Sequence, residues 1–390
     1  MRVVHVTPYF APAFGYGGPP RSILGLCQSL QRAGVDVEVV TTSANGNRPL
    51  PIVPDTPTEY EGVIVTYAGM AFPQRFFGAR LRAPLTAALQ RADLCHVHGI
   101  WNVPEWVATR LARSAEVPYV VSPRGMLLAA ARRRGRWRKA IAYNAIERPM
   151  LRRAAMLHAT SSDEAAALGE AAPFVPVVVI PNGVTIDGST AVRPPIRHRL
   201  SIPDGAFVVA FVGRIHPIKR LDLVAGAFVA LRNRGIDAYL VLAGPDEGGL
   251  VPSIMRSVGS HGTAVRTLGE VDDADRWAVM HAADAVVQCS DSESFGLAVV
   301  EALAAGTPVV VTRTLPWRDI ETARCGCWVE QSVPAITAAL QVFATNPDER
   351  SAMGMRGAAY AREHYDWTAI GRRMADAYRT AVGRRRRAVV

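Results

Sequence analysis

The segment SESFGLAVVEALAAGTPVV, residues 292–310, places two glutamates around an apolar run. Glu293 precedes the run, and Glu301 lies inside it. An unpaired carboxylate on an apolar helix face is costly, so Glu301 needs a partner or a ligand. One carboxylate can accept two hydrogen bonds from a ribose diol, and the other can bind sugar hydroxyl groups. The alternatives are a solvated loop carboxylate for Glu293, and a helix-surface residue or paired core charge for Glu301.

The same segment predicts a strand-to-helix turn. AVVQCS is expected to be a strand, LAVVEALAAG a helix that ends at Gly306, and TPVVV the next strand. The first amides of such a helix lack internal acceptors and carry partial positive charge, so they suit a phosphate or an oxyanion. Doubly wound folds bind ligands at this edge of the sheet. The candidate binding residues at the turn are Ser294, Phe295, Gly296 and Leu297.

A second group of candidates lies in FVGRIHPIKRLD, residues 211–222, which predicts a strand, a turn and a helix start. Arg214 and Lys219 flank the turn, and Gly213 precedes it. Two cations at the carboxyl end of a strand can hold a diphosphate and neutralise its charge as a bond breaks. Lys219 is one of only two lysines among 44 basic residues, and the two side chains are not interchangeable at a site. The alternative is a pair of exposed loop cations.

The glycine loop PYFAPAFGYGGPPRS, residues 8–22, follows the first expected strand. Gly17 and Gly18 stand in it, ahead of a helix that is expected to begin near Pro19. The loop is similar to a phosphate-binding turn, but it lacks the spacing of a dinucleotide fingerprint.

Two patterns raise the question of a metal ion. HVHGIW, residues 96–101, ends a strand, so His98 can face an interdomain cleft, and His96 alternates with it along the strand. No third ligand is evident, so no zinc site is predicted. DDAD, residues 272–275, spells an Asp-x-Asp metal motif, but it precedes an expected helix, and capping is the preferred interpretation.

The elements that position these residues alternate regularly. Short β-branched runs are expected as strands, with amphipathic helices such as 22–34 and 103–115 between them. The expected strands are 2–7, 35–42, 62–67, 94–98, 117–122, 175–180, 207–213, 238–244, 264–269, 285–290 and 308–312. Such alternation gives parallel sheets covered on both faces. Because the pattern restarts after residues 193–195, we expect two doubly wound α/β domains with a junction near 182–205.

Composition sets further bounds. The chain has 390 residues, enough for two or three domains. Five cysteines without zinc spacing predict reduced thiols in a cytosolic protein, and the CGC at 325–327 is interpreted as buried or loop thiols rather than a redox pair. No run is long and apolar enough to span a bilayer, and the start MRVVHVTPYF favours a strand over a secretory signal.

The net charge of +10 is concentrated in the first half, where residues 1–190 hold 20 Lys/Arg against 13 Asp/Glu. Within RRRGRWRKA, residues 132–140, a tryptophan and aliphatic neighbours accompany the cations, as at an interfacial membrane contact. A solvated helix face and a nucleic-acid patch are the alternatives, but no RNA or DNA module surrounds the run. The predicted membrane-contact residues are Arg132, Arg133, Arg134 and Trp137. The tail GRRRRAVV is expected to be disordered.

Together these motifs resemble retaining glycosyltransferase family four, whose GT-B fold has two Rossmann-like domains. The match covers nearly the whole chain in order. The segments that carry it are GRIHPIKRLD (213–222), ESFGLAVVE (293–301) with its two glutamates separated by seven residues, IPNGV (180–184) at the end of the first domain, and the glycine loop. A subgroup that builds bacterial surface polysaccharides is similar in SPRGML (122–127), YNAIERPMLRRAA (143–155) and LPWRDIETARCGCWV (315–329).

The resemblance implies roles for the candidates. Arg214 and Lys219 would hold the donor diphosphate, and Glu301 the ribose hydroxyl groups. Glu293, with the amides of residues 295–297, would hold the donor sugar. The loop at Gly269 and Glu270 would lie near the base.

In the first domain, His98 would contact a sugar hydroxyl group, and Gly17 and Gly18 would approach the β-phosphate. Arg124 is assigned to the acceptor side. This sequence departs from the family at Arg220, where glycine is common, and in the prolines of GYGGPPR.

The resemblance also implies an organisation. An acceptor-side domain at 1–190 would precede a nucleotide-sugar domain at 191–366, a helix at 367–383 would pack back on the first domain, and a basic tail would occupy 384–390. The implied activity moves a hexose from a UDP- or GDP-sugar to a hydroxyl group of a glycan or polyprenyl-linked acceptor, with retention and without a metal or other cofactor.

The enzyme would act in the cytoplasm, at the anionic inner face of the membrane, in polysaccharide or lipopolysaccharide synthesis. The alternatives are a sugar-nucleotide epimerase of the same fold, which needs no acceptor, and a nucleotide-sugar-binding protein without turnover. A nucleic-acid partner is not expected.

Overall fold

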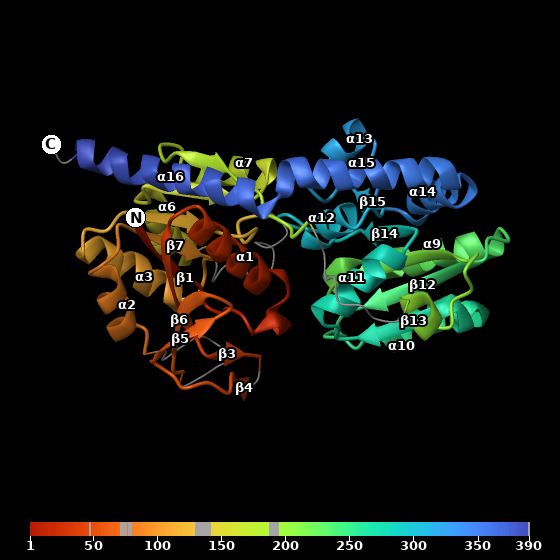
Figure 1. The fold of residues 1–390 in the computed structure, drawn as a ribbon, viewed down its shortest axis with the longest axis horizontal. Coiled ribbons are helices and arrows are strands. Elements are labelled where there is room, and N and C mark those ends of the chain that lie inside the picture. Colours follow the sequence, from red (N-terminus) through yellow and green to blue (C-terminus); the bar gives the residue numbers. More distant parts are fainter. Residues whose placement is uncertain (47, 71–75, 77–79, 129–141, 187–194, 389–390) are drawn as a thin grey trace. The chain divides into compact units, whose positions relative to one another are not determined.

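The computed structural model describes residues 1–46, 48–70, 76, 80–128, 142–186 and 195–388. The chain divides into two compact units, Met1–Gly183 with Trp367–Val390, and Val184–Asp366. Each unit is built on its own mainly parallel sheet (Figure 1), which confirms the predicted α/β class with two Rossmann-like units. The first division falls between Gly183 and Val184, a few residues before the boundary expected from the sequence.

The first unit contains a sheet in the order β10-β9-β8-β7-β1-β2-β6-β5, in which only the β5–β6 pair is antiparallel. Its strands are β1 (Arg2–Val6), β2 (Asp36–Thr42), β5 (Pro57–Tyr60), β6 (Val63–Ala68), β7 (Leu94–His98), β8 (Tyr119–Ser122), β9 (Met156–Ala159) and β10 (Val177–Val179). A separate antiparallel ribbon pairs β3 (Ala44–Asn45) with β4 (Arg48–Pro49).

Helices cover both faces of this sheet. They are the 3-10 turn η1 (Phe14–Tyr16), α1 (Gly18–Arg32), α2 (Arg82–Leu89), α3 (Val103–Ser114), the π-helix η3 (Tyr143–Glu147), α6 (Arg148–Arg152), α7 (Ser162–Ala171) and α16 (Trp367–Ala388). Alternate side chains of β1 point to opposite faces. Val3 packs in the core that includes α1 and α16, and Val4 and Val6 pack in the core that includes α2 and α3.

The second unit has an all-parallel sheet in the order β13-β12-β11-β14-β15-β16. Its strands are β11 (Phe207–Val212), β12 (Ala238–Ala243), β13 (Val265–Gly269), β14 (Ala285–Gln288), β15 (Val309–Thr312) and β16 (Gly326–Val329). Its helices are α8 (Ile196–Arg199), η4 (Pro217–Lys219), α9 (Leu221–Asn233), α10 (Val251–Val258), η5 (Gly259–Ala264), α11 (Asp273–Ala282), α12 (Leu297–Ala304), α13 (Asp319–Thr322), α14 (Val333–Thr345) and α15 (Pro347–Tyr365).

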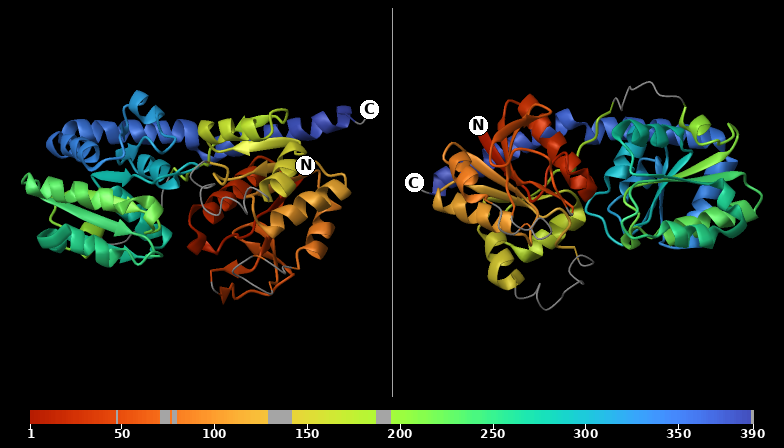
Figure 2. Two further views of the ribbon diagram at one scale, coloured as in Figure 1. Left: turned by 180° about the vertical axis from the view of Figure 1, so that it is seen from behind. Right: turned by 90° about the horizontal axis from the view of Figure 1, so that it is seen from below.

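Both faces of the second sheet are buried as well (Figure 2). Phe207, Val209 and Phe211 of β11 pack with α9, α10 and α14, whereas Val208 and Ala210 pack with α11 and α12. This burial on both faces explains why the strands are continuous apolar runs rather than alternating ones.

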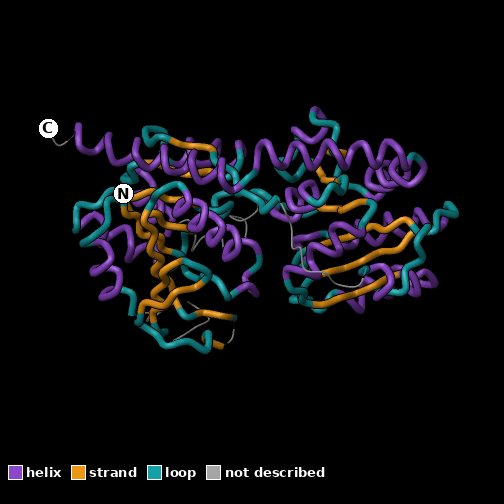
Figure 3. The backbone as a smooth tube through the Cα atoms, in the orientation of Figure 1, coloured by secondary structure: helices purple, strands orange, loops and turns teal. Residues whose placement is uncertain are grey.

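Most expected strands are present within one or two residues of their predicted ends (Figure 3). β3, β4, β5, β9 and β16 were not predicted. The prediction of a disordered tail was also wrong, because α16 continues through the arginine run to Ala388. Arginine is a strong helix former, and no proline follows Trp367 to stop the helix.

The cysteines are free thiols, as the sequence predicted. All five cysteines are free, and burial raises the pKa of both Cys325 and Cys327 to about 11. These thiols are therefore not activated, as the sequence predicted for the CGC.

In the described part of the chain, none of the helices combines the length and the hydropathy that crossing a membrane requires.

The C-terminal helix α16 packs directly on α1 in the first unit. Trp367 fills the space over Gly25 and Gly183, where a Cβ atom would come within 2.5 Å of its ring. Farther along, Tyr378 is fully buried and bonds to His96 of β7, with 2.6 Å between the hydroxyl oxygen and Nδ1. The helix is therefore part of the core of the first unit, although it is the last element of the chain.

Substitution of Gly371 tests this packing. A Cβ atom there would lie 2.5 Å from the Ser29 carbonyl oxygen of α1, so Gly371→Ala forces the two backbones apart and should lower the unfolding free energy by about 1–3 kcal/mol. Gly383→Ala is the matched control in the same helix, because nothing lies within 4 Å of its Cβ position. The control should be neutral or stabilising by up to ~1 kcal/mol.

Urea unfolding and hydrogen exchange of the α16 amides would measure both variants. Equal stabilities would show that α16 does not depend on this close contact with α1.

Candidate active site

Two loops at the carboxyl edge of the second sheet bring opposite charges together. β11 leads through Gly213 and Arg214 into η4, and β14 leads into the loop before α12. Because β11 and β14 are parallel neighbours, these loops leave the sheet side by side. The Lys219 ammonium contacts the Glu293 carboxylate, and the two side chains are only 17% and 19% exposed. The structure therefore places these two predicted residues in one site.

Hydrogen bonds between the loops hold this ion pair in place. The Asp291 amide donates to the Ile218 carbonyl at 2.8 Å, and the Cys289 thiol points at the carbonyls of Lys219 and Arg220. The Ser290 hydroxyl donates to the Glu293 carboxylate at 3.3 Å. The charged pair is thus supported from both loops.

The start of α12 adds polar groups to the same edge. Gly296 has a φ of +87° and immediately precedes the helix, so the backbone turns there in a conformation that favours glycine. Phe295 is buried against Trp317 and Tyr365 and anchors the turn. The Val299 amide donates to the Gly296 carbonyl at 2.9 Å. The amides of Leu297 and Ala298 come before it, where a helix offers no acceptor of its own. At the other end Gly306 follows the helix with a φ of +76°, as predicted.

Arg214 lies on the same loop but has a different partner. Its guanidinium donates to Glu247, in the loop after β12, at 2.8 Å. Both side chains are more exposed than Lys219 and Glu293, at 38% and 33%. The sequence analysis missed Glu247, although it follows the glycine that ends a predicted strand.

Glu301 is buried on α12 and contacts the guanidinium of Arg276 on α11. Arg276 also lies 3.3 Å from Asp273. Burial acts to lower the pKa of Arg276, but the charges of Glu301 and Asp273 raise it overall. The carboxylate inside the apolar run is therefore a paired buried charge, and the sequence analysis did not identify its partner.

The DDAD segment confirms the capping interpretation. The Asp272 carboxylate accepts from the Asp275 amide at 2.8 Å and caps α11. Asp275 itself accepts hydrogen bonds from both terminal nitrogens of Arg199, at 2.7 and 3.0 Å.

Glycines stand next to one another at the carboxyl ends of three strands of the second sheet: Gly213 follows β11, Gly244 follows β12 and Gly269 ends β13. The Gly213 amide donates to the Ala243 carbonyl, and the Gly244 amide donates to the Gly269 carbonyl. A Cβ atom on Gly244 would lie 1.9 Å from the Gly213 carbonyl oxygen. The backbones therefore meet without side chains between them. Gly213 and Gly269 were predicted site residues, and Gly244 was missed.

The glycine loop of the first unit follows β1. Gly17, with a φ of +87°, precedes α1, and Gly18 is the first residue of that helix, one position before the predicted start. Within the loop, the Tyr9 and Tyr16 rings stack with 4.2 Å between their centroids. The two glycines thus lie at a helix N-terminus at the carboxyl end of a strand.

His98 ends β7 and is buried in a hydrogen-bonded chain. Arg124 Nη2 lies 3.1 Å from His98 Nδ1, and His98 Nε2 lies 2.9 Å from His5 Nδ1. A guanidinium only donates, so His98 Nδ1 must be the acceptor and its proton lies on Nε2, which donates to His5. Both nitrogens of His98 are therefore engaged, and a sugar hydroxyl group would have to displace one of these partners.

His5 also provides the third histidine that the sequence did not reveal beside His96 and His98. Ligand nitrogens of the three lie within 4.8 Å of one another, because β1 and β7 pair with His5 opposite His96. His98, however, has no free lone pair, since Arg124 occupies the one on Nδ1. Burial and the Arg124 charge also lower the pKa of His5 to about 3. The arrangement fits a chain of neutral histidines better than a metal site.

Arg124 connects three segments of the first unit. It has a φ of +56° after β8, and its Nη1 donates to Asn182 at 2.7 Å and to Ser22 at 3.1 Å. Arg124 thus touches β7, α1 and the IPNGV segment at once. The other predicted acceptor-side residues, Arg132, Arg133, Arg134 and Trp137, lie outside the described residues.

Two buried glutamates next to the HGIW segment were also missed. The Trp101 amide and the Trp106 indole donate to Glu147, which ends the π-helix η3, and Asn102 donates to Glu105 of α3. Burial raises the pKa of Glu105 to about 8 and that of Glu147 to about 7, and the charge of Glu147 contributes to the first shift.

Both units match known families. Residues 17–183 match the family model described as glycosyl transferase 4-like domain, and residues 192–360 match glycosyl transferases group 1. The chain is 31% identical to D-inositol 3-phosphate glycosyltransferase of Kineococcus radiotolerans, over 97% of this chain and 94% of that protein.

Two solved structures are similar in fold. Sucrose-phosphate synthase from Thermosynechococcus elongatus superposes with a TM-score of 0.77 at 19% identity, covering 97% of this chain and 98% of that one. Anabaena Alr3699/HepE in complex with UDP and glucose superposes with a TM-score of 0.74 at 18% identity, covering 97% and 99%.

The buried glutamates predict a pH dependence of stability. The folded protein keeps protons on Glu105 and Glu147 that the unfolded chain releases above about pH 4.5. Their contribution to stability is therefore complete below about pH 4.5 and is lost as the pH rises towards 8. Glu105→Gln should flatten the decrease in Tm between pH 6.5 and 8.5, the range that leads up to and through the raised pKa of this carboxyl group.

Glu170→Gln, at an exposed position of α7, is the control and should keep the wild-type slope. If Glu105→Gln and wild type lost Tm equally over this range, the carboxyl group of Glu105 would not be protonated in the fold.

Proposed function

The chain belongs to the GT-B glycosyltransferases, with a glycosyl transferase 4-like domain and a group 1 domain, and we propose that it moves a sugar from a nucleoside-diphosphate sugar to a hydroxyl group with retention of configuration. The observation that carries this proposal is the contact of Lys219 with Glu293 beside the N-terminus of α12. A cation, a carboxylate and the first amides of a helix at one sheet edge are the groups that a sugar diphosphate requires.

In the proposed complex, the diphosphate binds Lys219, Arg214 and the first amides of α12. These cations now lie against Glu293 and Glu247, so the diphosphate would compete with two carboxylates. Glu293, once released from Lys219, could accept hydrogen bonds from the sugar hydroxyl groups. As the bond to the sugar breaks, the same cations and helix dipole would stabilise the departing diphosphate, which is where charge develops.

Glu301 is proposed to bind the ribose hydroxyl groups. Its contact with Arg276 supports this role, because a buried carboxylate held by a cation keeps a fixed orientation. The glycines at the ends of β11, β12 and β13 would let the nucleotide approach the backbone.

We propose a uridine nucleotide as the donor, with a guanosine nucleotide as the alternative. The similar Anabaena protein is in complex with UDP and glucose, which supports this choice. No metal is proposed, because Lys219 and Arg214 supply the positive charge and the aspartates of DDAD cap a helix and pair with arginines.

The proposed acceptor is a hydroxyl group of a glycan or polyprenyl-linked glycan at the inner face of the cytoplasmic membrane, in the synthesis of a surface polysaccharide. The basic segment at 132–140 and the subgroup motifs support it. An inositol phosphate is the second candidate, because the Kineococcus relative is named for that acceptor. A sugar-nucleotide epimerase of the same fold would need neither.

Lys219→Met tests the assignment of the phosphate-binding cation. Removal of one group that stabilises developing charge typically lowers kcat about a hundred- to a thousandfold, and we expect a loss of that order. Arg234→Met is the matched control, since Arg234 is an exposed cation that bonds to Gln341. A Lys219→Met enzyme with near-normal kcat would contradict the assignment.

The reaction itself is tested by incubating the protein with UDP- and GDP-sugars in the presence of EDTA, with bacterial lipid extract or D-inositol 3-phosphate as acceptor. We expect one donor to raise the Tm and to release its nucleotide only when an acceptor is present. The anomeric configuration of the product, measured by NMR, should match that of the donor.

Conversion of the donor sugar without any acceptor would favour the epimerase instead. A strict requirement for Mn²⁺ or Mg²⁺ would contradict the metal-independent mechanism, and nucleotide release with D-inositol 3-phosphate alone would contradict the polyprenyl-linked acceptor.

A further inference from the structure

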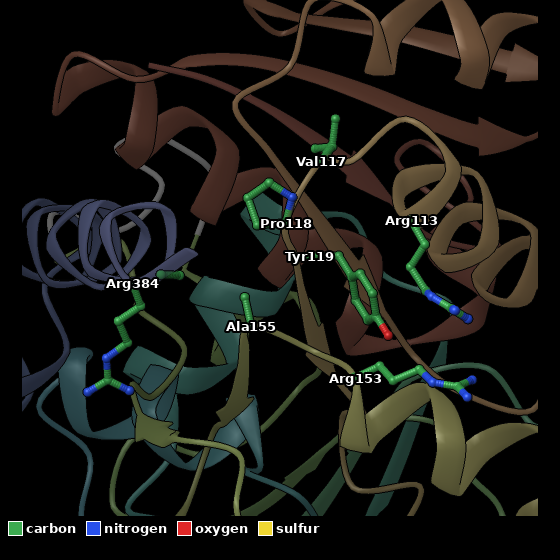
Figure 4. Close-up of a pocket in the computed structure, with 8 residues that line it drawn as sticks. Arg113, Val117, Pro118, Tyr119, Arg153, Ala155 and Arg384 are labelled. Carbon is green, nitrogen blue, oxygen red and sulfur yellow. The ribbon is translucent and has the colours of Figure 1, made fainter. Parts of the chain in front are cut away.

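A cavity of about 410 Å³ opens in the first unit at the amino ends of β8 and β9 (Figure 4). Tyr119 begins β8, and Ala155 directly precedes β9. His98 is the last residue of β7, and Arg124 follows β8, so they lie at the opposite edge of the same parallel sheet. β8 has 4 residues and spans on the order of 13 Å. The cavity is therefore separate from the residues to which the proposed function assigns a role.

Three arginines from three elements line this cavity. Arg113 is in the last turn of α3, Arg153 follows α6, and Arg384 is near the end of α16. All three are exposed, and none of them has a carboxylate partner among the residues that the structure describes. Arg110 and Arg152 are exposed and likewise have no carboxylate partner among the described residues, so what distinguishes the three arginines is that they surround one hollow.

Figure 4 shows how the cavity is arranged. The guanidinium groups of Arg113 and Arg153 lie on the same side of the Tyr119 ring, near its hydroxyl group, whereas Arg384 lies on the other side of the ring, next to Ala155. Tyr119 is buried, and its hydroxyl group donates to the Met150 carbonyl at 2.8 Å, so the ring is fixed. Burial raises the pKa of Tyr119 to about 12, although both neighbouring guanidinium charges act to lower it. The phenol is therefore neutral and adds no negative charge to the cavity.

Helix ends explain part of this arrangement. Cations are favourable near helix C-termini, which accounts for Arg113 on α3 and Arg153 at the end of α6, each taken alone. It does not account for their sharing one cavity with an arginine of α16. Guanidinium groups present several donors in a plane and bind phosphate through two of them at once.

We propose that this cavity binds a small phosphorylated molecule, with its phosphate group between Arg113 and Arg153 and a second anionic group near Arg384. The remaining wall is apolar, formed by Val117, Pro118 and Ala381, and suits a compact organic body. A bilayer surface fits less well, because a membrane contact uses exposed aromatic and long apolar side chains, and the aromatic residue in this cavity is buried.

The test measures binding of D-fructose 1,6-bisphosphate and of inorganic phosphate by isothermal titration calorimetry at low salt. We expect the bisphosphate to bind more tightly. Arg113→Gln and Arg153→Gln should each weaken its binding at least about tenfold, the effect of losing one charge-assisted contact. All three arginines are exposed, so these variants should fold, and unchanged Tm values would confirm it.

Two controls make the result specific. Arg110→Gln removes an exposed charge from the same helix, one turn away and outside the cavity, and should leave binding unchanged. Lys219→Met separates this cavity from the proposed donor site of the second unit, because binding here should survive that change. The inference therefore does not depend on the proposed function.

Three outcomes would overturn the proposal. Equal weakening by Arg110→Gln and Arg113→Gln would indicate a diffuse attraction to positive charge. Binding that is lost in Lys219→Met and kept in Arg113→Gln and Arg153→Gln would belong to the second unit. Binding only to phosphatidylglycerol vesicles, and not to the soluble bisphosphate, would show that the source of the phosphate is a lipid.

Discussion

The parallel pairing of β11 with β14 is the constraint on which the candidate site of the second unit depends. Lys219 and Glu293 are 74 residues apart in the chain, and they meet because these two strands are neighbours whose loops leave the same edge. Bonds from Asp291 and Cys289 to the opposite loop then fix the distance between them. A charged pair held this way has already lost its conformational freedom, so a ligand that replaces one partner gains affinity from preorganisation.

The first unit has a different constraint, a guanidinium next to buried histidines. Arg124 cannot lose its proton in a protein, so the neighbouring histidines must be neutral if the cluster is to remain buried. Its hydrogen bond to His98 then determines which nitrogen of each ring carries the proton, first in His98 and then in His5. A single arginine after β8 thus determines the protonation of one histidine on β7 and one on β1. It also connects this cluster to α1 and to Asn182.

Sequence patterns predicted the features that are local. The strand, turn and helix around Lys219 occupy residues 207–233 and those around Glu293 occupy residues 285–304, and their apolar runs and glycines are visible in the sequence. The short strand β9 has no such run, because none of its 4 residues, MLHA, is β-branched.

Partners across the fold could not be predicted in the same way. Arg276 for Glu301, Glu247 for Arg214 and His5 for His98 come from other elements, and only the strand order brings them together. Nothing in the local sequence distinguishes Glu105, which is buried beneath Gly99, from an ordinary acidic residue in the first turn of a helix.

The cations of the candidate donor site and those of the arginine-lined cavity differ in whether an anion must displace a carboxylate to bind them. Arg214 and Lys219 both contact carboxylates, so an anion gains only the difference between the new ion pairs and the old ones. A diphosphate carries more charge and has two groups that can contact both cations, so it can displace both carboxylates with a net gain in binding free energy. A monophosphate would replace a single carboxylate with little net gain. The pairing would therefore select for diphosphates.

Arg113, Arg153 and Arg384 face no such competition among the described residues. Even a phosphate monoester could bind them without breaking an ion pair, and the geometry of the cavity, rather than an exchange of charges, would decide which molecule is held. The same side chain, arginine, would thus serve two different kinds of recognition in one chain, and the presence or absence of a nearby carboxylate distinguishes them.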